Sequence, residues 1–132
     1  MTTRANATFQ IKNWDEKTYE EIGDPLKLTR ASVSCVYQGD IEGESKLEYL
    51  MAYSTDGASF VGLEHLVGRI GGRSGSCVLQ YTGTFETPGV KATFFVVPGC
   101  GTDELRNLKG EGRYELVGQH DSYQITLDYD FA

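Results

Sequence analysis

Residues 41–85 read IEGESKLEYLMAYSTDGASFVGLEHLVGRIGGRSGSCVLQYTGTF, which is three strand-like runs separated by two turns that contain glycine. The first turn is Ser54–Gly57, and Asp-Gly between alternating runs is a strong short-range hairpin signal. The second turn is Gly71–Gly72, where two residues without a Cβ supply the positive φ of a tight turn. The stretch therefore predicts three consecutive antiparallel strands.

Similar patterns extend in both directions along the chain. Alternating or β-branched and aromatic runs predict further strands at residues 7–14, 26–38, 90–97, 109–117 and 119–131. The acidic segment 15–25 carries Gly23, Asp24 and Pro25, and this composition predicts a surface loop. Residues 98–102 interrupt the pattern, and one short helical turn near residues 102–108 is expected, with Thr102 as its cap.

About eight antiparallel strands with short connections predict an all-β fold that either closes or stacks into two layers. A closed barrel removes both sheet edges, and about eight strands leave an interior that side chains fill or that holds one small ligand. A two-sheet sandwich is the alternative. The length of the predicted strands favours the closed antiparallel barrel, as a single domain over residues 1–132.

The charge balance excludes some classes of partner. The chain has 12 Lys+Arg against 19 Asp+Glu, a net charge of −7, whereas binding to nucleic acid needs a basic face. There is no apolar run of about 18 residues, so no membrane span is expected. Three cysteines without CxxC spacing indicate free thiols and a cytoplasmic protein. The two histidines lie far apart in the sequence, and we expect neither a metal site nor a cofactor.

Two mid-strand glutamates, Glu48 and Glu64, are the candidate catalytic residues. If the hairpin has a three-residue loop at residues 55–57, these two residues lie directly opposite each other, with Cβ atoms about 5 Å apart. Two buried carboxylates at that distance do not both ionise easily, so one keeps its proton and can act as an acid. The register therefore predicts a facing pair.

The choice of register and of the inward face stays open. A two-residue loop places Glu48 opposite His65 instead. In the three-residue register, His65 and Tyr49 point to the opposite face from the glutamates. That second face also carries apolar side chains, so it either is the true interior or packs against another subunit. Its further members are Leu47, Met51, Tyr53, Leu63 and Val67.

A barrel with polar groups in its interior is expected to bind a small apolar ligand. The expected lining of that cavity is Leu50, Phe60, Gly62, Gln80 and Phe94. The first alternative is an isomerase or cyclase that uses Glu48 and Glu64 for general acid/base chemistry. The second is a non-catalytic structural module that forms homo-oligomers, and homo-oligomerisation is expected to accompany any of the three functions.

Several phrases resemble an uncharacterised bacterial family known as a domain of unknown function. They are Lys27–Val33, Gly39–Ser45, Glu48–Tyr53, Phe60–Glu64, Gly71–Ser76, Val97–Thr102 and Leu127–Phe131. The resemblance spans nearly the whole chain, and it implies an allene oxide cyclase-like barrel, related in fold to plant dirigent proteins. It implies no activity, because one barrel fold serves many unrelated functions.

Overall fold

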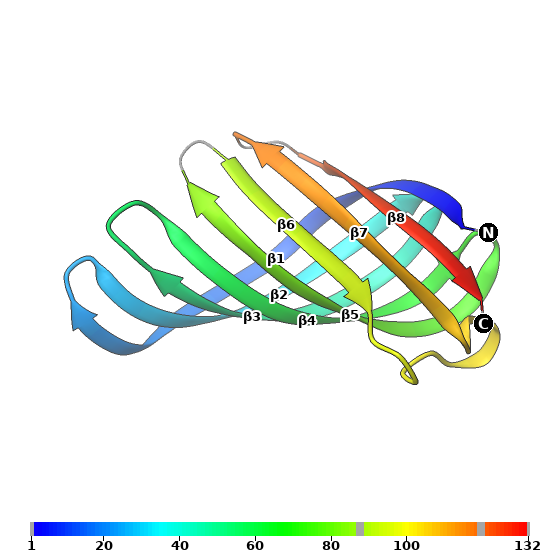
Figure 1. The fold of residues 1–132 in the computed structure, drawn as a ribbon, viewed down its shortest axis with the longest axis horizontal. Helices are drawn as coiled ribbons and strands as arrows, with labels where there is room; N and C mark the ends of the chain where they lie inside the picture. The colour runs from blue at the N-terminus through cyan, green and yellow to red at the C-terminus, as the bar shows by residue number, and fades with distance from the viewer. Residues whose placement is uncertain (1, 87–88, 119–120, 132) are drawn as a thin grey trace.

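The chain folds into eight antiparallel β-strands and one 3₁₀ turn in a computed structural model (Figure 1), which describes residues 2–86, 89–118 and 121–131. The strands are β1 (Thr3–Gly23), β2 (Leu26–Gly39), β3 (Ile41–Tyr53), β4 (Ala58–Ile70), β5 (Arg73–Glu86), β6 (Gly89–Val96), β7 (Leu108–Val117) and β8 (Tyr123–Phe131). The 3₁₀ turn, η1, covers Asp103–Leu105. The predicted all-β architecture with one short helical turn is confirmed.

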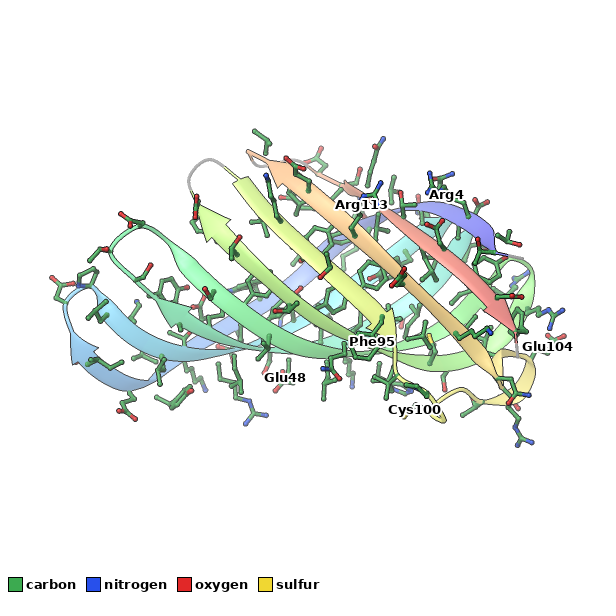
Figure 2. All side chains as sticks on the ribbon, viewed as in Figure 1. Arg4, Glu48, Phe95, Cys100, Glu104 and Arg113 are labelled. Carbon is green, nitrogen blue, oxygen red and sulfur yellow. The ribbon has the colours of Figure 1, made fainter. Side chains whose placement is uncertain are left out.

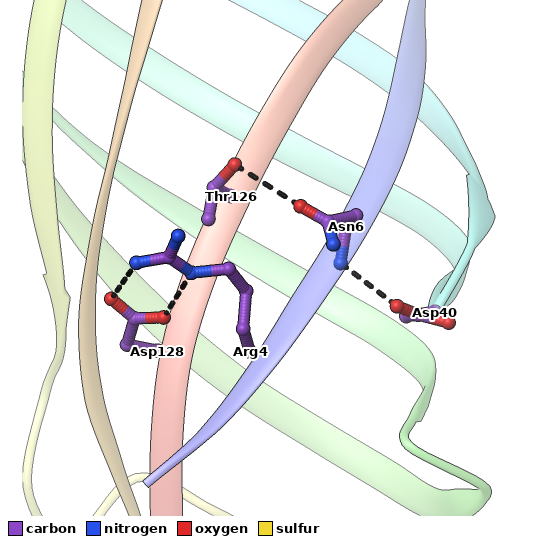
Figure 3. A network of polar contacts seen from close by, with 5 residues as sticks. All are labelled: Arg4, Asn6, Asp40, Thr126 and Asp128. Carbon is purple, nitrogen blue, oxygen red and sulfur yellow. Dashed lines mark hydrogen bonds and ion pairs between the residues drawn. The ribbon is translucent and has the colours of Figure 1, made fainter.

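The strands pair in sequence order and form a closed barrel, because β8 returns to β1. Along this seam Thr3 pairs with Tyr129 and Phe9 with Tyr123. Polar contacts on the outer surface reinforce the seam (Figure 3). Nε and Nη2 of Arg4 donate to the two carboxylate oxygens of Asp128 at 2.8 and 3.2 Å. The closed topology confirms the predicted barrel.

Alternation along each strand separates an inner face from an outer one. On β4 the inward series is Ala58, Phe60, Gly62, Glu64, Leu66, Gly68 and Ile70. Inward glycines leave room for rings from neighbouring strands: a Cβ on Gly62 would lie 2.6 Å from Cδ1 of Tyr49, and one on Gly83 would lie 2.5 Å from Cζ of Phe60. Aromatic rings thus fill space that these glycines leave open.

The prediction of a surface loop at residues 15–25 is wrong, because β1 continues through most of this segment. β1 and β2 stay paired from Ala7 and Gly39 to Gly23 and Leu26, with register shifts such as the one between Ile11 and Asn13. Acidic side chains do not prevent a strand here, because β2 pairs with one edge of the segment while most of its side chains stay in solvent. Among the described residues, β8 pairs with β1 only over Thr3–Phe9, so the far half of this hairpin extends past the barrel (Figure 1).

The β3–β4 connection has four residues, 54–57, rather than the three or two that the sequence suggested. Tyr53 pairs with Ala58, and Ser54 closes the turn by donating from its amide N to the carbonyl oxygen of Gly57 at 2.7 Å. The extra residue changes the register, so Glu48 pairs with Leu63 and Leu47 with Glu64. The predicted facing of Glu48 and Glu64 is therefore wrong, and so is the alternative facing of Glu48 and His65.

The segment before β7 lies at the end of the barrel opposite the β1–β2 turn (Figure 1). It places Leu105 of η1 in the core, where 1% of the residue is exposed. Thr102 flanks η1, but its hydroxyl makes no capping hydrogen bond, so its predicted capping role is wrong. That hydroxyl instead accepts a hydrogen bond from the amide N of Ser76 at 3.0 Å, which ties the segment to β5.

Three glycines lie side by side across adjacent strands at this same end of the barrel, opposite the β1–β2 turn. Gly43 on β3 pairs with Gly68 on β4, and Gly68 pairs with Gly75 on β5. A row without side chains lets the backbones approach closely, which suits the strong curvature of these strands (Figure 1). The predicted last strand, residues 119–131, falls partly on residues 119–120, which lie outside the described residues.

Candidate functional site

The barrel interior contains one fully buried carboxylate, Glu64 on β4, which is 0% exposed. Three hydroxyl groups donate to it. The Tyr37 hydroxyl lies 2.9 and 2.8 Å from the two carboxylate oxygens, the Ser45 hydroxyl 2.5 Å from Oε2, and the Tyr81 hydroxyl 2.5 Å from Oε1. We call Glu64, Tyr37, Ser45 and Tyr81 the interior polar cluster. A buried charge needs such partners, because an unpaired one costs several kcal/mol.

Burial dominates the acid–base properties of this cluster. It raises the pKa of Glu64, and the hydrogen bonds from Ser45, Tyr81 and Tyr37 offset part of that rise. Burial likewise raises the pKa of Tyr37 and Tyr81, and the nearby Glu64 charge raises them further. Both tyrosines therefore stay protonated and keep donating to the carboxylate.

The two buried cysteines line the same interior. Burial, followed by the charge of Glu64, raises the pKa of both the Cys35 and Cys77 thiols to about 12. Thiols in that state are poor nucleophiles, because the reactive species is the thiolate. The third cysteine, Cys100, is exposed, and all three are free.

A cavity of about 330 Å³ lies in the half of the barrel nearer the β3–β4 turn. Among the described residues its walls are almost entirely apolar, and none of the side chains that line it is charged. The aromatic members of the lining are Phe9, Trp14, Tyr49, Tyr53, Phe60, Phe85, Tyr114 and Tyr123. Aliphatic and sulfur-containing side chains such as Val33, Met51 and Leu116 complete it.

The hydroxyls of Tyr49 and Tyr114 form a polar spot in this apolar wall, where their oxygens lie 3.2 Å apart. Tyr81 packs behind them, with ring centroids 6.3 Å from Tyr49 and 6.0 Å from Tyr114. Since Tyr81 also bonds Glu64, it connects the interior polar cluster to the cavity wall. Glu64 itself does not line the cavity.

A second polar cluster borders the cavity where the β1–β2 hairpin leaves the barrel. Glu16 accepts hydrogen bonds from Nε1 of Trp14 at 3.0 Å, from the hydroxyl of Thr29 at 2.7 Å, and from the hydroxyl of Tyr53. Trp14 and Tyr53 are themselves lining residues. Nζ of Lys27 lies 4.9 Å from the centroid of the Tyr53 ring. We call Trp14, Glu16, Lys27, Thr29 and Tyr53 the rim cluster.

Larger depressions exist on the outside of the barrel, but they are more open to solvent than the interior cavity. One of about 610 Å³ lies over β5 to β8 and is lined by Thr82, Lys91, Arg113, Glu115 and Gln124, among others. The interior cavity is the better candidate site, because ligand pockets bury most of a small molecule against apolar walls.

The structure separates the two predicted catalytic residues. Glu64 points inward, whereas Glu48 lies on the outer face (Figure 2), where its side chain is 45% exposed and pairs with Nη2 of Arg30 at 2.7 Å. Hydrogen bonds from Ser32 and Arg30 lower the pKa of Glu48. Glu48 is thus an ordinary surface carboxylate, because the four-residue turn places it on the outer face.

The five predicted ligand-binding residues also divide between the faces. Phe60 lines the cavity. Phe94 and Gly62 lie on the inner face, Phe94 buried beside Tyr81 at 4.9 Å between ring centroids, but neither lines the cavity. Leu50, 50% exposed, and Gln80 lie on the outer face, so their placement in an interior was wrong.

The observed register also corrects the predicted second face, the one expected to carry His65 and Tyr49 together. Leu47 and Tyr49 are buried and line the cavity, whereas Leu63, Val67 and His65 are exposed on the outside. His65 pairs across the sheet with Lys46 and Val78, neither of which orients an imidazole for catalysis. Sequence reasoning missed Trp14 and Glu16 as site residues. The signal that could have found them is the chain's one tryptophan, Trp14, followed two positions later by the acidic Glu16.

The described part of the chain holds no cluster of three His, Cys, Asp or Glu side chains arranged to bind a metal ion. Within the same residues, no helix has the length and apolar character needed to cross a membrane.

Residues 5–129 match the family described as protein of unknown function (DUF3224). The chain belongs to this family. A crystal structure of a DUF3224 protein with unknown function from Shewanella oneidensis MR-1 superposes with a TM-score of 0.79, covering 100% of this chain and 99% of that chain at 23% sequence identity. No curated protein matches the sequence.

Membership in DUF3224 confirms the expected resemblance to a family of unknown function. At 23% identity the Shewanella structure shows a shared fold and nothing about chemistry. The finer grouping with allene oxide cyclase-like barrels stays a prediction.

Proposed function

We propose that this DUF3224 protein binds a small, largely apolar molecule in the cavity of its barrel. The observation that carries the proposal is the cavity itself: about 330 Å³, walled by aromatic and aliphatic side chains. Ligand sites occupy about 300–1,000 Å³ and combine apolar walls with a few polar groups. The volume lies at the small end of that range, which suits a compact ligand of one or two rings.

The Tyr49–Tyr114 pair supplies the polar contact that orients such a ligand. The two hydroxyls share one hydrogen bond at 3.2 Å. Because two hydroxyls carry two hydrogens and their mutual bond uses one, the pair keeps one O–H free to donate. Both residues line the cavity, so a carbonyl or hydroxyl oxygen of the ligand is a suitable acceptor.

Binding is favoured over the isomerase or cyclase alternative by the placement of Glu64. An acid/base catalyst must come within hydrogen-bond reach of the proton that it transfers. Glu64 has a raised pKa, but three hydroxyls occupy its carboxylate and it does not line the cavity. The catalytic alternative therefore lacks a carboxyl in contact with the ligand site.

Trp14 gives a direct test of binding, since it is the chain's one tryptophan and lines the cavity. A neutral bicyclic compound such as 1-naphthylmethanol is expected to bind with saturation in calorimetry and to change the Trp14 emission. Native mass spectrometry of the protein as purified tests whether a cellular molecule is already bound. No saturable binding of such compounds, with no retained molecule, would contradict the proposal.

Val33→Phe is expected to reduce the affinity for 1-naphthylmethanol at least about tenfold, because a ring replaces an isopropyl group in the cavity wall. Val33 is 4% exposed and lines the cavity. The matched control is Val61→Phe, the same substitution at an outer-face position that is 52% exposed. Calorimetric titration of both variants is the measurement, and equal affinities for the two would place the binding site elsewhere.

We also propose that the outer face of β3 to β6 joins two copies of the chain. Leu50 and Val61 are directly paired, and Leu63 and Phe95 both pair with Gln80. These four apolar side chains are 43–53% exposed, and a grouped apolar surface of this kind marks interaction sites.

Leu63→Glu is therefore expected to shift the protein towards the monomer, because it buries a charge between the copies. The measurement is the molar mass by light scattering over a range of concentrations. Ile22→Glu serves as the control, since Ile22 is 59% exposed on the β1–β2 hairpin, outside this face. A wild-type protein that is monomeric at all concentrations would contradict the proposed interface.

The remaining expectations stay proposals of the same kind. We propose a single domain over residues 1–132 and a cytoplasmic location, which the three free thiols support. The described elements form one barrel with one core, which supports a single domain. Limited proteolysis and cell fractionation are the corresponding tests.

A further inference from the structure

We infer that the ligand of the cavity is an organic amine, whose ammonium group binds between Glu16 and Tyr53 at the rim while its apolar body enters the cavity. This inference rests on the proposed function and names the ligand class that the same site selects. Four features of the rim cluster carry it: an ionised carboxylate, aromatic faces, a resident ammonium and the surrounding charge.

The carboxylate is Glu16, which lies two residues after Trp14 and therefore on the same side of β1. The register shift after Ile11 places this side beside the buried residues of β2, where Trp14 pairs with Val33 and Glu16 with Ala31. Donors from Trp14, Thr29 and Tyr53 hold it in position. A carboxylate accepts about four hydrogen bonds, so it retains capacity for one more donor. Although burial by itself raises the pKa of Glu16, the bonds from Tyr53, Thr29 and Trp14 outweigh it and lower that pKa, so the group is anionic at neutral pH.

Aromatic rings continue from this carboxylate into the cavity. Trp14 and Tyr53 line the cavity and bond Glu16 directly. The Trp14 and Tyr49 ring centroids lie 6.0 Å apart, and Tyr49 meets Phe60 edge-on at 5.0 Å. A cation within about 6 Å of a ring centroid is attracted by the face of the ring, most strongly for tryptophan. The rim thus offers cation-binding faces beside an anion.

Lys27 already places an ammonium at this point. Its Nζ lies 4.9 Å from the Tyr53 centroid, and its charge helps to lower the pKa of Glu16. The side chain is long, flexible and only half-buried, so it can move into solvent at small cost. Lys27 therefore stands in for the ammonium of a ligand, and an incoming amine replaces it with the same contacts.

The surrounding charge favours a cation over an anion. Residues 15–27 contain five acidic residues, Asp15, Glu16, Glu20, Glu21 and Asp24, against two lysines. Among the described residues, no arginine, lysine or histidine lines the cavity, and Lys27 at the rim is the one cation beside it. A negative rim concentrates cations near the entrance and repels acids.

Three compounds that share one ring system separate the charge of the ligand from its shape. At pH 7, 1-naphthylmethylamine is cationic, 1-naphthylmethanol is neutral and 1-naphthoate is anionic. We expect the amine to bind about tenfold more tightly than the alcohol, because a partly desolvated ion pair with cation–π contacts supplies that difference, and naphthoate to bind most weakly. Calorimetry at low ionic strength measures all three.

Two rim variants are expected to act in opposite directions on the amine alone. Glu16→Gln removes the anion and lowers the affinity for the amine about tenfold, whereas Lys27→Met removes the competing ammonium and raises it several-fold. Affinity for the alcohol stays within about twofold in both variants. Lys17→Met is the matched control, because Lys17 is exposed and pairs across the hairpin with Arg30, and it leaves both affinities unchanged.

The outcomes distinguish this inference from the proposed function. If the alcohol binds and the amine binds no better, the amine inference is wrong while the binding function stands. If neither compound binds to the wild type, both are wrong. Circular dichroism checks that each variant is folded; should Glu16→Gln fail to fold, Lys27→Met decides alone, and an unchanged affinity for the amine in that variant overturns the inference.

Discussion

Glu64→Ala is expected to lower the free energy of unfolding by about 4 kcal/mol, the largest effect that we predict for a single substitution. The change leaves a cavity in a region where Glu64 is fully buried, and it removes the acceptor of three hydroxyls on Tyr37, Ser45 and Tyr81. Both losses are costly, since cavities and unsatisfied buried donors each destabilise by about 1–5 kcal/mol. Urea denaturation measures the effect.

Glu64→Gln tests the charge of the same group through the pH dependence of stability. Burial raises the pKa of Glu64 above its ordinary 4.5, so the folded protein binds this proton more tightly than the unfolded chain does. The wild type must therefore lose stability relative to Glu64→Gln as the pH rises from about 4.5 through the raised pKa. The difference between the two unfolding free energies, followed from pH 4 to 8, measures this trend.

Glu48→Gln is the natural control, because the pKa of Glu48 is lowered by Ser32 and Arg30 on the surface. Its contribution to stability has the opposite sign: it is present above the ordinary pKa and is lost as the pH falls through the lowered one. A flat difference between wild type and Glu64→Gln across the whole range would show that the buried carboxyl does not titrate differently in the folded state.

Gly68→Ala is expected to destabilise the protein by about 3 kcal/mol through overpacking. A Cβ at this position would overlap the carbonyl oxygen of Glu42 and lie 2.7 Å from Cα of Gly43. Both obstacles are backbone atoms of β3, which cannot rotate away as a side chain would. The strands must therefore separate at the curved end of the barrel, and the denaturation midpoint should fall.

Gly72→Ala provides the comparison for Gly68→Ala. A Cβ on Gly72 meets nothing within 4 Å, and only its positive φ of 84° opposes a side chain. Placing a side chain in that left-handed backbone conformation lowers the free energy of unfolding by about 1–2 kcal/mol. If Gly68→Ala destabilises no more than Gly72→Ala, close approach of the β3 and β4 backbones is not what the glycine row provides.

The strands themselves were predictable because alternation is a local property of the sequence. The inner face was not, because it depends on the length of the β3–β4 turn. Asp56-Gly57 indicated a two- or three-residue loop, whereas hydrogen bonds between Ser54 and Gly57 close a four-residue one. One extra residue inverted the faces of the whole strand relative to its partner, which moved Glu48 outside and left Glu64 inside.

The site was harder to predict than the fold, because its members are brought together by closure. Tyr37 on β2 and Tyr81 on β5 meet at Glu64 on β4, and Tyr114 on β7 reaches Tyr49 on β3 across the interior. No local pattern encodes such contacts. The rim cluster was missed for a different reason: residues 15–25 looked like a loop, and a loop gives Glu16 no fixed direction.

The β1–β2 hairpin has a further consequence for how the protein behaves at high concentration. Beyond the seam with β8, only β2 pairs with β1 among the described residues, so one side of that strand offers its backbone amides and carbonyls to any extended peptide. Tyr19 and Ile22 are 58% and 59% exposed there, which would make self-association into cross-β aggregates favourable. Glu20 and Glu21 lie between those two residues. Their negative charges repel the same charges on a second copy, which opposes pairing of two such edges.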